Sequence, residues 1–173
     1  MKELIITIGS LIIGIITTVL ITRAYYRRSL TKSLTPYIKY SCSLLNDDFS
    51  DVRRDLKVIY KKQEIDDLYE ICFLIVNTGD KPIQDVIEPL TLSIPEKCTL
   101  LEASFFPKED KPKNIKIKIS KNKKKVSYVF PLLNRREFFM TRLLLNGTPV
   151  EKDFEFSIIC AGLPPILKPV PLP

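Results

Sequence analysis

Two patterns of hydrophobic and polar positions divide the chain. From Leu4 to Thr22 nineteen consecutive residues carry no charge, whereas after Pro36 apolar residues alternate with polar ones. A helix rises about 1.5 Å per residue, so nineteen residues cover roughly 28 Å, close to the thickness of the hydrocarbon core of a bilayer. The first pattern therefore predicts a membrane-spanning helix over residues 4–22, and the second predicts β-strands.

Nine segments after Pro36 show the two-residue repeat of a strand, at intervals of roughly ten residues, with turn-forming residues between them. They span residues 37–44, 56–61, 69–76, 90–94, 99–106, 114–120, 126–132, 138–145 and 154–160. Residues 70–76 are apolar on both faces and are expected to form a central strand. Short strands at this spacing predict one all-β domain, an immunoglobulin-like sandwich, with a small barrel as the alternative.

The predicted organisation has five parts. They are a short N-terminus (1–3), the transmembrane α-helix (4–22), a basic juxtamembrane connector (23–36), the β-sandwich domain (37–162) and a proline-rich tail (163–173). The tail has five prolines among eleven residues, and proline lacks the N–H donor that a central strand needs. We expect the tail to pack back on the sandwich as an extended segment, with docking to a partner as the alternative.

Basic residues are concentrated on the C-terminal side of the apolar run. Lysine and arginine near a span are retained on the cytoplasmic side more often than they are translocated, and tyrosine favours the headgroup region. The predicted membrane-flank residues are Arg23, Arg27, Arg28, Lys32, Tyr25 and Tyr26. We therefore predict a single-pass protein of the cell membrane, with its C-terminal domain in the cytoplasm and membrane lipid as a partner. A cleaved signal peptide is the alternative, because Thr22 and Ala24 could form a small-residue cleavage pair.

Small residues recur at every fourth position inside the apolar run. Ser10, Gly14 and Thr18 share one face of the predicted helix, and small residues at this spacing let two helices approach closely in lipid. The pattern predicts helix packing through this face, and hence a homo-oligomer. Glycine and threonine are also common in spans that make no such contact.

Residue types that carry catalysis are scarce. The chain has no histidine, which removes the commonest general base and metal ligand. The four cysteines, Cys42, Cys72, Cys98 and Cys160, lack metal-type spacing and are expected to be free buried thiols. Five scattered glycines exclude a phosphate-cradling loop. We predict a protein that is not an enzyme and that binds no cofactor or metal.

Positive charge is concentrated between Lys108 and Lys125. Nine lysines stand there against two carboxylates, a local net charge equal to the +7 of the whole chain. The stretch is predicted to form a hairpin with lysines on its solvent-exposed face and tip. The anion-binding candidates are Lys116, Lys118, Lys121, Lys123, Lys124 and Lys125.

Three interpretations of this lysine-rich stretch stay open. It could protect an exposed strand edge against aggregation, contact lipid headgroups, or bind a nucleic acid or nucleotide. Base-specific recognition is disfavoured, because the stretch has no arginine or aromatic residue that could contact or stack on a base.

Several short motifs resemble those of a known class of protein. Residues 73–83, FLIVNTGDKPI, form a strand, an Asn-x-Gly turn and a second strand. Residues 131–134 are PLLN, residues 156–158 are FSI and residues 161–163 are AGL. Together these motifs are similar to uncharacterised bacterial single-pass membrane proteins with an immunoglobulin-like β-sandwich domain. The resemblance implies a fold, and it brings no catalytic or binding residues with it.

Three functions are compatible with these features. The first is a membrane-anchored cytosolic binding or scaffold protein that recruits or assembles a partner complex and self-associates through its span. The second is a ligand-responsive sensor or effector of a bacterial stress or phage-defence system. The third is an outward-facing accessory subunit for transport or secretion.

Overall fold

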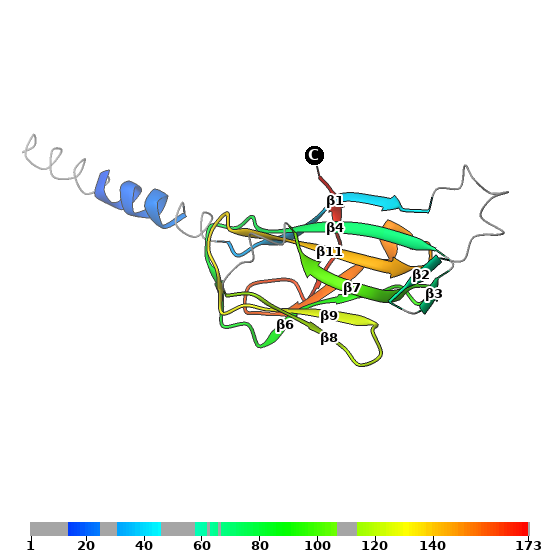
Figure 1. The fold of residues 1–173 in the computed structure, drawn as a ribbon. Coiled ribbons are helices and arrows are strands. Elements are labelled where there is room, and N and C mark those ends of the chain that lie inside the picture. The colour runs from blue at the N-terminus through cyan, green and yellow to red at the C-terminus, as the bar shows by residue number, and fades with distance from the viewer. Residues whose placement is uncertain are drawn as a thin grey trace, which may run out of the picture. The chain divides into compact units, whose positions relative to one another are not determined.

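The computed structural model describes residues 14–24, 31–45, 58–61, 63–65, 67–106 and 114–172 of the chain. The chain forms two compact units, Met1–Thr31 and Lys32–Pro173. The described part of the first unit is a helix over residues 14–24 whose side chains are exposed. The second unit contains all the described β-strands (Figure 1).

The prediction of a membrane-spanning helix is wrong. None of the helical segments in the described residues has the length and apolar character that crossing a bilayer requires. Within the described residues the helical segment covers residues 14–24, and eleven residues rise roughly 16 Å, about half of the hydrocarbon core. The uncharged run indicates apolar composition, which does not by itself establish the helix of about 20 residues that a span requires. The predicted fold class is corrected in its N-terminal part, and the predicted single-pass location in the cell membrane is not retained.

Part of the predicted span and its flank lies outside the described residues. These positions are residues 4–13, which include Ser10, and residues 25–30, which include Tyr25, Tyr26, Arg27 and Arg28. Arg23 belongs to the helix, whereas Lys32 belongs to the second unit. Within the helix, the Thr18 hydroxyl donates a hydrogen bond of 2.8 Å to the carbonyl oxygen of Gly14. Helix packing through Ser10, Gly14 and Thr18 stays a prediction.

Five strands of the second unit form one sheet, here called the first sheet. They are β1 (Leu34–Ser43), β4 (Leu68–Asn77), β7 (Thr99–Phe105), β11 (Phe138–Asn146) and β14 (Val170–Pro171). Their order across the sheet is β14-β1-β4-β11-β7. Neighbouring strands are antiparallel except β14, which runs parallel to β1. The apolar strand predicted at residues 70–76 is thus the central strand β4.

Another five strands form the second sheet. They are β6 (Glu88–Ser93), β8 (Lys116–Ile119), β9 (Lys125–Val129), β12 (Glu155–Ile159) and β13 (Ile166–Leu167), in the order β13-β12-β6-β9-β8. Two small sheets complete the described strands: β2 (Val58–Tyr60) pairs with β3 (Gln63–Ile65), and β5 (Ile83–Gln84) pairs with β10 (Leu132–Leu133). A 3-10 turn, Glu151–Asp153, precedes β12. Figure 1 shows the two large sheets as two layers.

The order of the main strands is that of an immunoglobulin sandwich. Constant-type immunoglobulin domains have strands A, B, E and D in one sheet and C, F and G in the other. With β1, β4, β6, β7, β11, β12 and β13 taken as A to G, the first sheet has the order A-B-E-D and the second contains G-F-C. The hairpin β8–β9 is inserted between D and E and extends the second sheet beside β6.

The core lies between the two large sheets. Phe73 of β4 packs edge-on against Phe154 and Phe156, with ring centroids 5.4 and 5.2 Å apart, and all three side chains are fully buried. Tyr128 of β9 is also buried, and its hydroxyl donates a hydrogen bond of 3.2 Å to Thr141. Burial raises the pKa of Tyr128 well above the usual value. Aromatic packing across the layers therefore holds the sheets together.

Strand positions differ from the sequence expectations most clearly at β1 and in the proline-rich tail. β1 begins at Leu34, inside the segment predicted as a connector, and includes Pro36. This proline is tolerated because β14 pairs only with Tyr37 and Ile38, so β1 is an edge at Pro36. The proline-rich tail packs on both sheets, since β13 pairs with β12 and β14 with β1. Strands of two residues are too short to show a repeat in the sequence.

Candidate anion-binding hairpin and the adjoining cleft

The lysine-rich stretch contains the antiparallel hairpin β8–β9. Val126 and Tyr128 of β9 are fully buried and face the core, so the alternate positions face outward. Lys125 is exposed on that outer face, and cross-strand pairing places Lys116 opposite Val129 and Lys118 opposite Ser127. Three lysines therefore project from one side of the hairpin.

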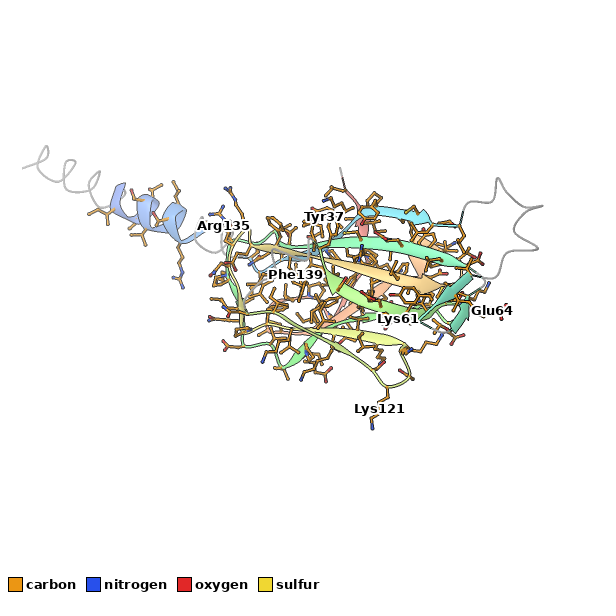
Figure 2. All side chains as sticks on the ribbon, in the orientation of Figure 1. Tyr37, Lys61, Glu64, Lys121, Arg135 and Phe139 are labelled. Carbon is orange, nitrogen blue, oxygen red and sulfur yellow. The ribbon has the colours of Figure 1, made fainter. Side chains whose placement is uncertain are left out.

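The turn of the hairpin is held by its own hydrogen bonds. The backbone N–H of Lys123 donates to the carbonyl of Ser120 at 2.9 Å, and the backbone N–H of Lys124 donates to the Asn122 side chain at 3.2 Å. The Asn122 side chain also accepts a hydrogen bond of 2.6 Å from the Ser120 hydroxyl. Lys121 and Lys123 are exposed in this turn, and Figure 2 shows Lys121 projecting away from the sandwich.

Lys124 differs from the other candidates. Its side-chain amine donates hydrogen bonds of 2.7 Å to the carbonyl of Glu96 and 2.8 Å to the carbonyl of Cys98. The side chain is half-buried, whereas the other five candidates are exposed. Lys124 therefore fastens the hairpin to the neighbouring loop and is not available to an anion.

The remaining five candidates have no acidic partner in the described part of the chain. We call them the hairpin lysines: Lys116, Lys118, Lys121, Lys123 and Lys125. The ion pairs found among the described residues, Lys61–Glu102 at 2.6 Å and Arg135–Asp80 at 3.0 Å, both lie elsewhere. The positive charge of the hairpin is thus directed to the solvent.

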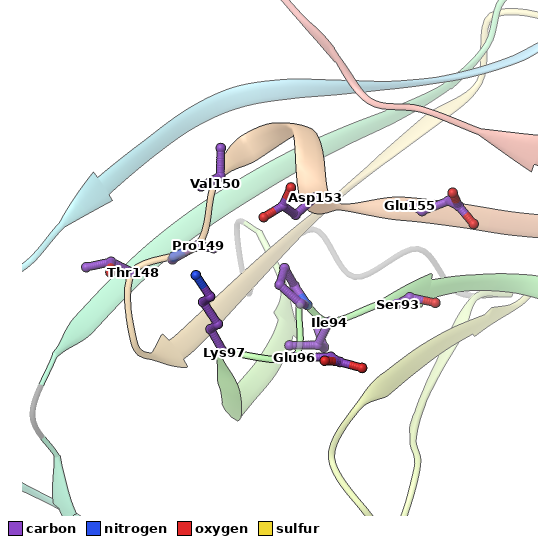
Figure 3. A pocket seen from close by; sticks show the side chains of 10 residues that line it. Ser93, Ile94, Glu96, Lys97, Thr148, Pro149, Val150, Asp153 and Glu155 are labelled. Atoms are coloured by element: carbon purple, nitrogen blue, oxygen red, sulfur yellow. The ribbon is translucent and has the colours of Figure 1, made fainter.

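A cleft of about 690 Å³ adjoins the hairpin. Its two walls are residues 93–97 and a segment from Thr148 to Glu155. In Figure 3, Asp153 and Glu155 stand on one wall, and Glu96 and Lys97 on the other. We call it the acidic cleft, because three carboxylates and one amine line it.

Gly147 lets the two walls of the acidic cleft approach each other. Its φ is +107°, and a Cβ atom built on it would lie 2.8 Å from the carbonyl oxygen of Lys97. Only glycine fits such a position without movement of the backbone. The sequence did not predict the cleft, because its walls are about fifty residues apart in the chain.

The hairpin and the acidic cleft are neighbours on the outer face of the second sheet. Lys125 pairs across strands with Ser93, and Ser93 pairs with Glu155. Val126, Leu92 and Phe156 are buried, so the three residues of this row point outward. Lys125 and Glu155 are therefore separated by two strand spacings, roughly 10 Å. A basic surface and an acidic one therefore meet side by side.

Other polar groups of the described residues are structural. Glu102 accepts hydrogen bonds from the Tyr60 hydroxyl at 2.5 Å and the Lys61 amine at 2.6 Å, fastening β2–β3 to β7, and the bond to Glu102 raises the pKa of Lys61. Burial raises the pKa of the Tyr40 hydroxyl, which also donates a hydrogen bond of 2.6 Å to Glu70. These contacts hold the strands in place.

The cysteines are free thiols, and three of the four are buried. Burial raises the pKa of Cys72 and Cys98, which disfavours the reactive thiolate. Within the described residues no group of three or more Cys, Asp or Glu side chains could hold a metal ion. Cys42 differs from the expectation of burial, because it lies exposed near the end of β1.

Comparison with known proteins identifies no family. No family model and no curated protein matches the chain. Among solved structures, the chain matches a GH20 exo-β-N-acetylglucosaminidase from Vibrio harveyi, as an inactive mutant and in complex with N-acetylglucosamine. The TM-scores are 0.37 and 0.38 at 8% identity, and each match covers 82% of this chain and 18% of the enzyme chain. Likeness at this level carries no functional argument.

Proposed function

We propose that this protein is a non-catalytic binding module that assembles a complex by capturing an acidic protein surface on the hairpin lysines. One observation carries the proposal: five exposed lysines share one hairpin, and none has an acidic partner among the described residues. The hydrogen-bonded turn and the anchor of Lys124 hold the backbone that carries these lysines in a constant arrangement. Such pre-organisation lowers the entropic cost of binding.

The binding energy would come from several weak contacts. An exposed ion pair contributes roughly 0.2–1 kcal/mol, and salt screens it over about 10 Å at moderate ionic strength. Clustered charge also steers a partner of opposite sign and raises the association rate. We therefore expect rapid, salt-sensitive binding of moderate strength.

The chemistry of the hairpin favours an acidic protein over a nucleic acid. Arginine and exposed aromatic side chains, which contact or stack on bases, are absent from its described residues. Tyr128, the aromatic residue of β9, is buried in the core. The adjoining cleft does not favour an anionic nucleotide either, because three carboxylates face a single lysine there.

A titration with labelled poly-glutamate tests the proposal. The hairpin variant combines Lys118→Gln, Lys121→Gln and Lys125→Gln. The control variant removes the same charge from exposed lysines elsewhere: Lys81→Gln, Lys152→Gln and Lys168→Gln. We expect the hairpin variant to bind about tenfold more weakly than the wild type, since three contacts of roughly 0.5 kcal/mol are lost, and the control to bind nearly as well as the wild type.

Two outcomes would contradict the proposal. Equal losses in both variants would show that overall charge, rather than the hairpin, attracts the probe. Tighter binding of single-stranded DNA than of poly-glutamate, with the same dependence on the hairpin lysines, would assign the surface to nucleic acid instead.

A further inference from the structure

We propose that the acidic partner of the hairpin lysines is a second copy of this chain, whose acidic cleft receives them. The proposal rests on the proposed function, because it uses the same lysines. It adds the acidic cleft as the complementary surface and predicts a dimer in which each copy contributes both surfaces.

Charge complementarity is the first argument. The hairpin lysines are exposed, and the acidic cleft carries Glu96, Asp153 and Glu155 against one lysine, Lys97. The ion pairs found in the described residues involve none of these groups. Both surfaces therefore keep their charge open to solvent in a single copy.

Adjacency is the second argument. The row Lys125, Ser93 and Glu155 joins the two surfaces across neighbouring strands, and Lys124 fastens the hairpin to the loop that carries Glu96. When a basic and an acidic surface lie side by side, a two-fold axis between them places each surface opposite its complement in the other copy. Such an interface is isologous and closes after two copies.

Exposed apolar side chains supply the third argument. Val150 on a wall of the cleft is 52% exposed. Pro95 and Pro149 also line the cleft. Ion pairs at a surface give specificity and register more than affinity, so burial of Val150 and these prolines against the second copy would strengthen the contact.

Charge reversal tests the dimer in the full chain by sedimentation velocity at low and high salt. The hairpin-reversed variant combines Lys118→Glu, Lys121→Glu and Lys125→Glu. The cleft-reversed variant combines Glu96→Lys, Asp153→Lys and Glu155→Lys. Each variant alone is expected to dimerise at least about a hundredfold more weakly than the wild type, because attraction becomes repulsion.

The decisive test is whether combining the two charge reversals restores dimerisation. An equimolar mixture of the two reversed variants should form a heterodimer, since each hairpin then meets a cleft of opposite charge. A chain that carries both reversals should dimerise with itself, which also shows that the substituted domain folds. The matched control, Lys81→Glu, Arg136→Glu and Lys168→Glu, lies outside both surfaces and should dimerise like the wild type. High salt should dissociate every dimer.

Three results would overturn the inference. They are a wild type that stays monomeric at low salt, a mixture that fails to form heterodimers, and association that neither reversal weakens. The poly-glutamate titration separates this failure from failure of the proposed function. A monomeric wild type whose hairpin lysines still bind the probe refutes the dimer alone, whereas a monomeric wild type whose hairpin lysines do not bind the probe refutes both.

Discussion

The two large sheets bury equivalent faces against each other but present opposite chemistry to the solvent. The outer face of the first sheet is mainly apolar: Phe138 pairs with Val76, and Met140 pairs with Leu74. On the outer face of the second sheet, Ser127, Thr91 and Ser157 form a row of hydroxyls next to the lysines of β8 and β9. Alternation along the strands thus defines the core in both sheets, while the outer residues give each sheet its own surface.

Local contacts explain why the outer face of the first sheet is less accessible to a partner. Lys39 extends over the ring of Phe106, 5.6 Å from its centroid, and its amine lies 3.5 Å from the sulfur of Met140. Tyr40 packs edge-on against Phe106 with centroids 6.4 Å apart. Long side chains therefore cover apolar surface there. On the second sheet the hydroxyls of Thr91 and Ser127 bond to each other at 2.9 Å, and these short side chains leave the lysines unobstructed.

The role of a lysine in this region depends on whether its amine can donate hydrogen bonds to nearby backbone carbonyls. Lys124 and Lys121 belong to the same turn, but only Lys124 reaches the carbonyls of Glu96 and Cys98. One lysine stabilises the fold, and its neighbour is free to meet a partner. Exposure and hydrogen bonding, rather than the density of charge in the sequence, distinguish the two.

The largest expected loss of stability comes from a substitution in the core between the two large sheets. Phe73→Ala removes a fully buried ring that contacts Phe154 and Phe156, and should lower the free energy of unfolding by about 3–5 kcal/mol. Phe138→Ala removes a ring that is 57% exposed on the outer face, and should cost less than about 1 kcal/mol. Urea denaturation of the two variants measures both changes in the free energy of unfolding. Similar losses would show that the outer face of the first sheet is packed as tightly as the core.

Gly147→Ala should give the next largest effect. The added methyl would approach the Lys97 carbonyl to 2.8 Å in a backbone conformation with φ of +107°. We expect a loss of about 1–3 kcal/mol in the free energy of unfolding, measured by urea denaturation. Gly162→Ala is the control: its φ is also positive, but the nearest atom is a flexible carbon of Lys32 at 3.6 Å. An alanine at position 147 that costs no more than the control would contradict the close approach of the cleft walls.

Lys124→Met should separate the structural lysine from the hairpin lysines. It leaves the carbonyls of Glu96 and Cys98 without their donor, which should cost about 1–2 kcal/mol of unfolding free energy. Lys121→Met, at an exposed position, should change stability by less than about 0.5 kcal/mol. Thermal denaturation of the two variants and the wild type measures both changes in stability. If Lys121→Met is the more destabilising change, the assignment of these two lysines is wrong.

The smallest effect concerns the loop before β11 in the first sheet. The Asn134 side chain and backbone N–H donate hydrogen bonds to Glu137 at 3.0 and 2.6 Å and lower the pKa of its carboxyl below the ordinary 4.5. A lowered folded-state pKa contributes stability above the unfolded value, and this contribution is lost as the pH falls through the folded value. Because the group is exposed, the contribution is small.

Glu137→Gln should remove the part of the pH dependence of stability that comes from this carboxyl. The stability difference between wild type and variant should be largest near neutral pH and should shrink below pH 4.5. Melting temperatures measured across the acidic range provide the test. A difference that grows on acidification would mean that the carboxyl is stabilised in its protonated form.

The fold was largely predictable where the two-residue repeat is long. The run in residues 70–76, apolar on both faces, predicted the central strand β4, and the two-residue repeat in residues 114–120 predicted the strand β8. Strands β13 and β14 have two residues each and depend on pairing with distant strands. In the first unit, the uncharged run indicated apolar composition, and composition does not by itself establish a membrane-spanning helix.

The candidate site was predictable only in part. The charge density of the lysine-rich stretch identified the hairpin, but Lys124 has the same residue type as its neighbours. The carbonyls that it contacts lie 26 and 28 residues away in the chain, so no local pattern could single it out. The acidic cleft brings together two loops through tertiary packing, and its carboxylates looked like ordinary surface charges in the sequence.

Zero-length cross-linking of poly-glutamate to the full chain tests the central claim most directly. A carbodiimide joins carboxylates to amines only where the two are in contact, and peptide mapping then identifies the lysines. The account predicts cross-links at Lys116, Lys118, Lys121, Lys123 and Lys125, and few at Lys124. Cross-links distributed equally over Lys81, Lys152 and Lys168 would show that the hairpin is not a binding surface.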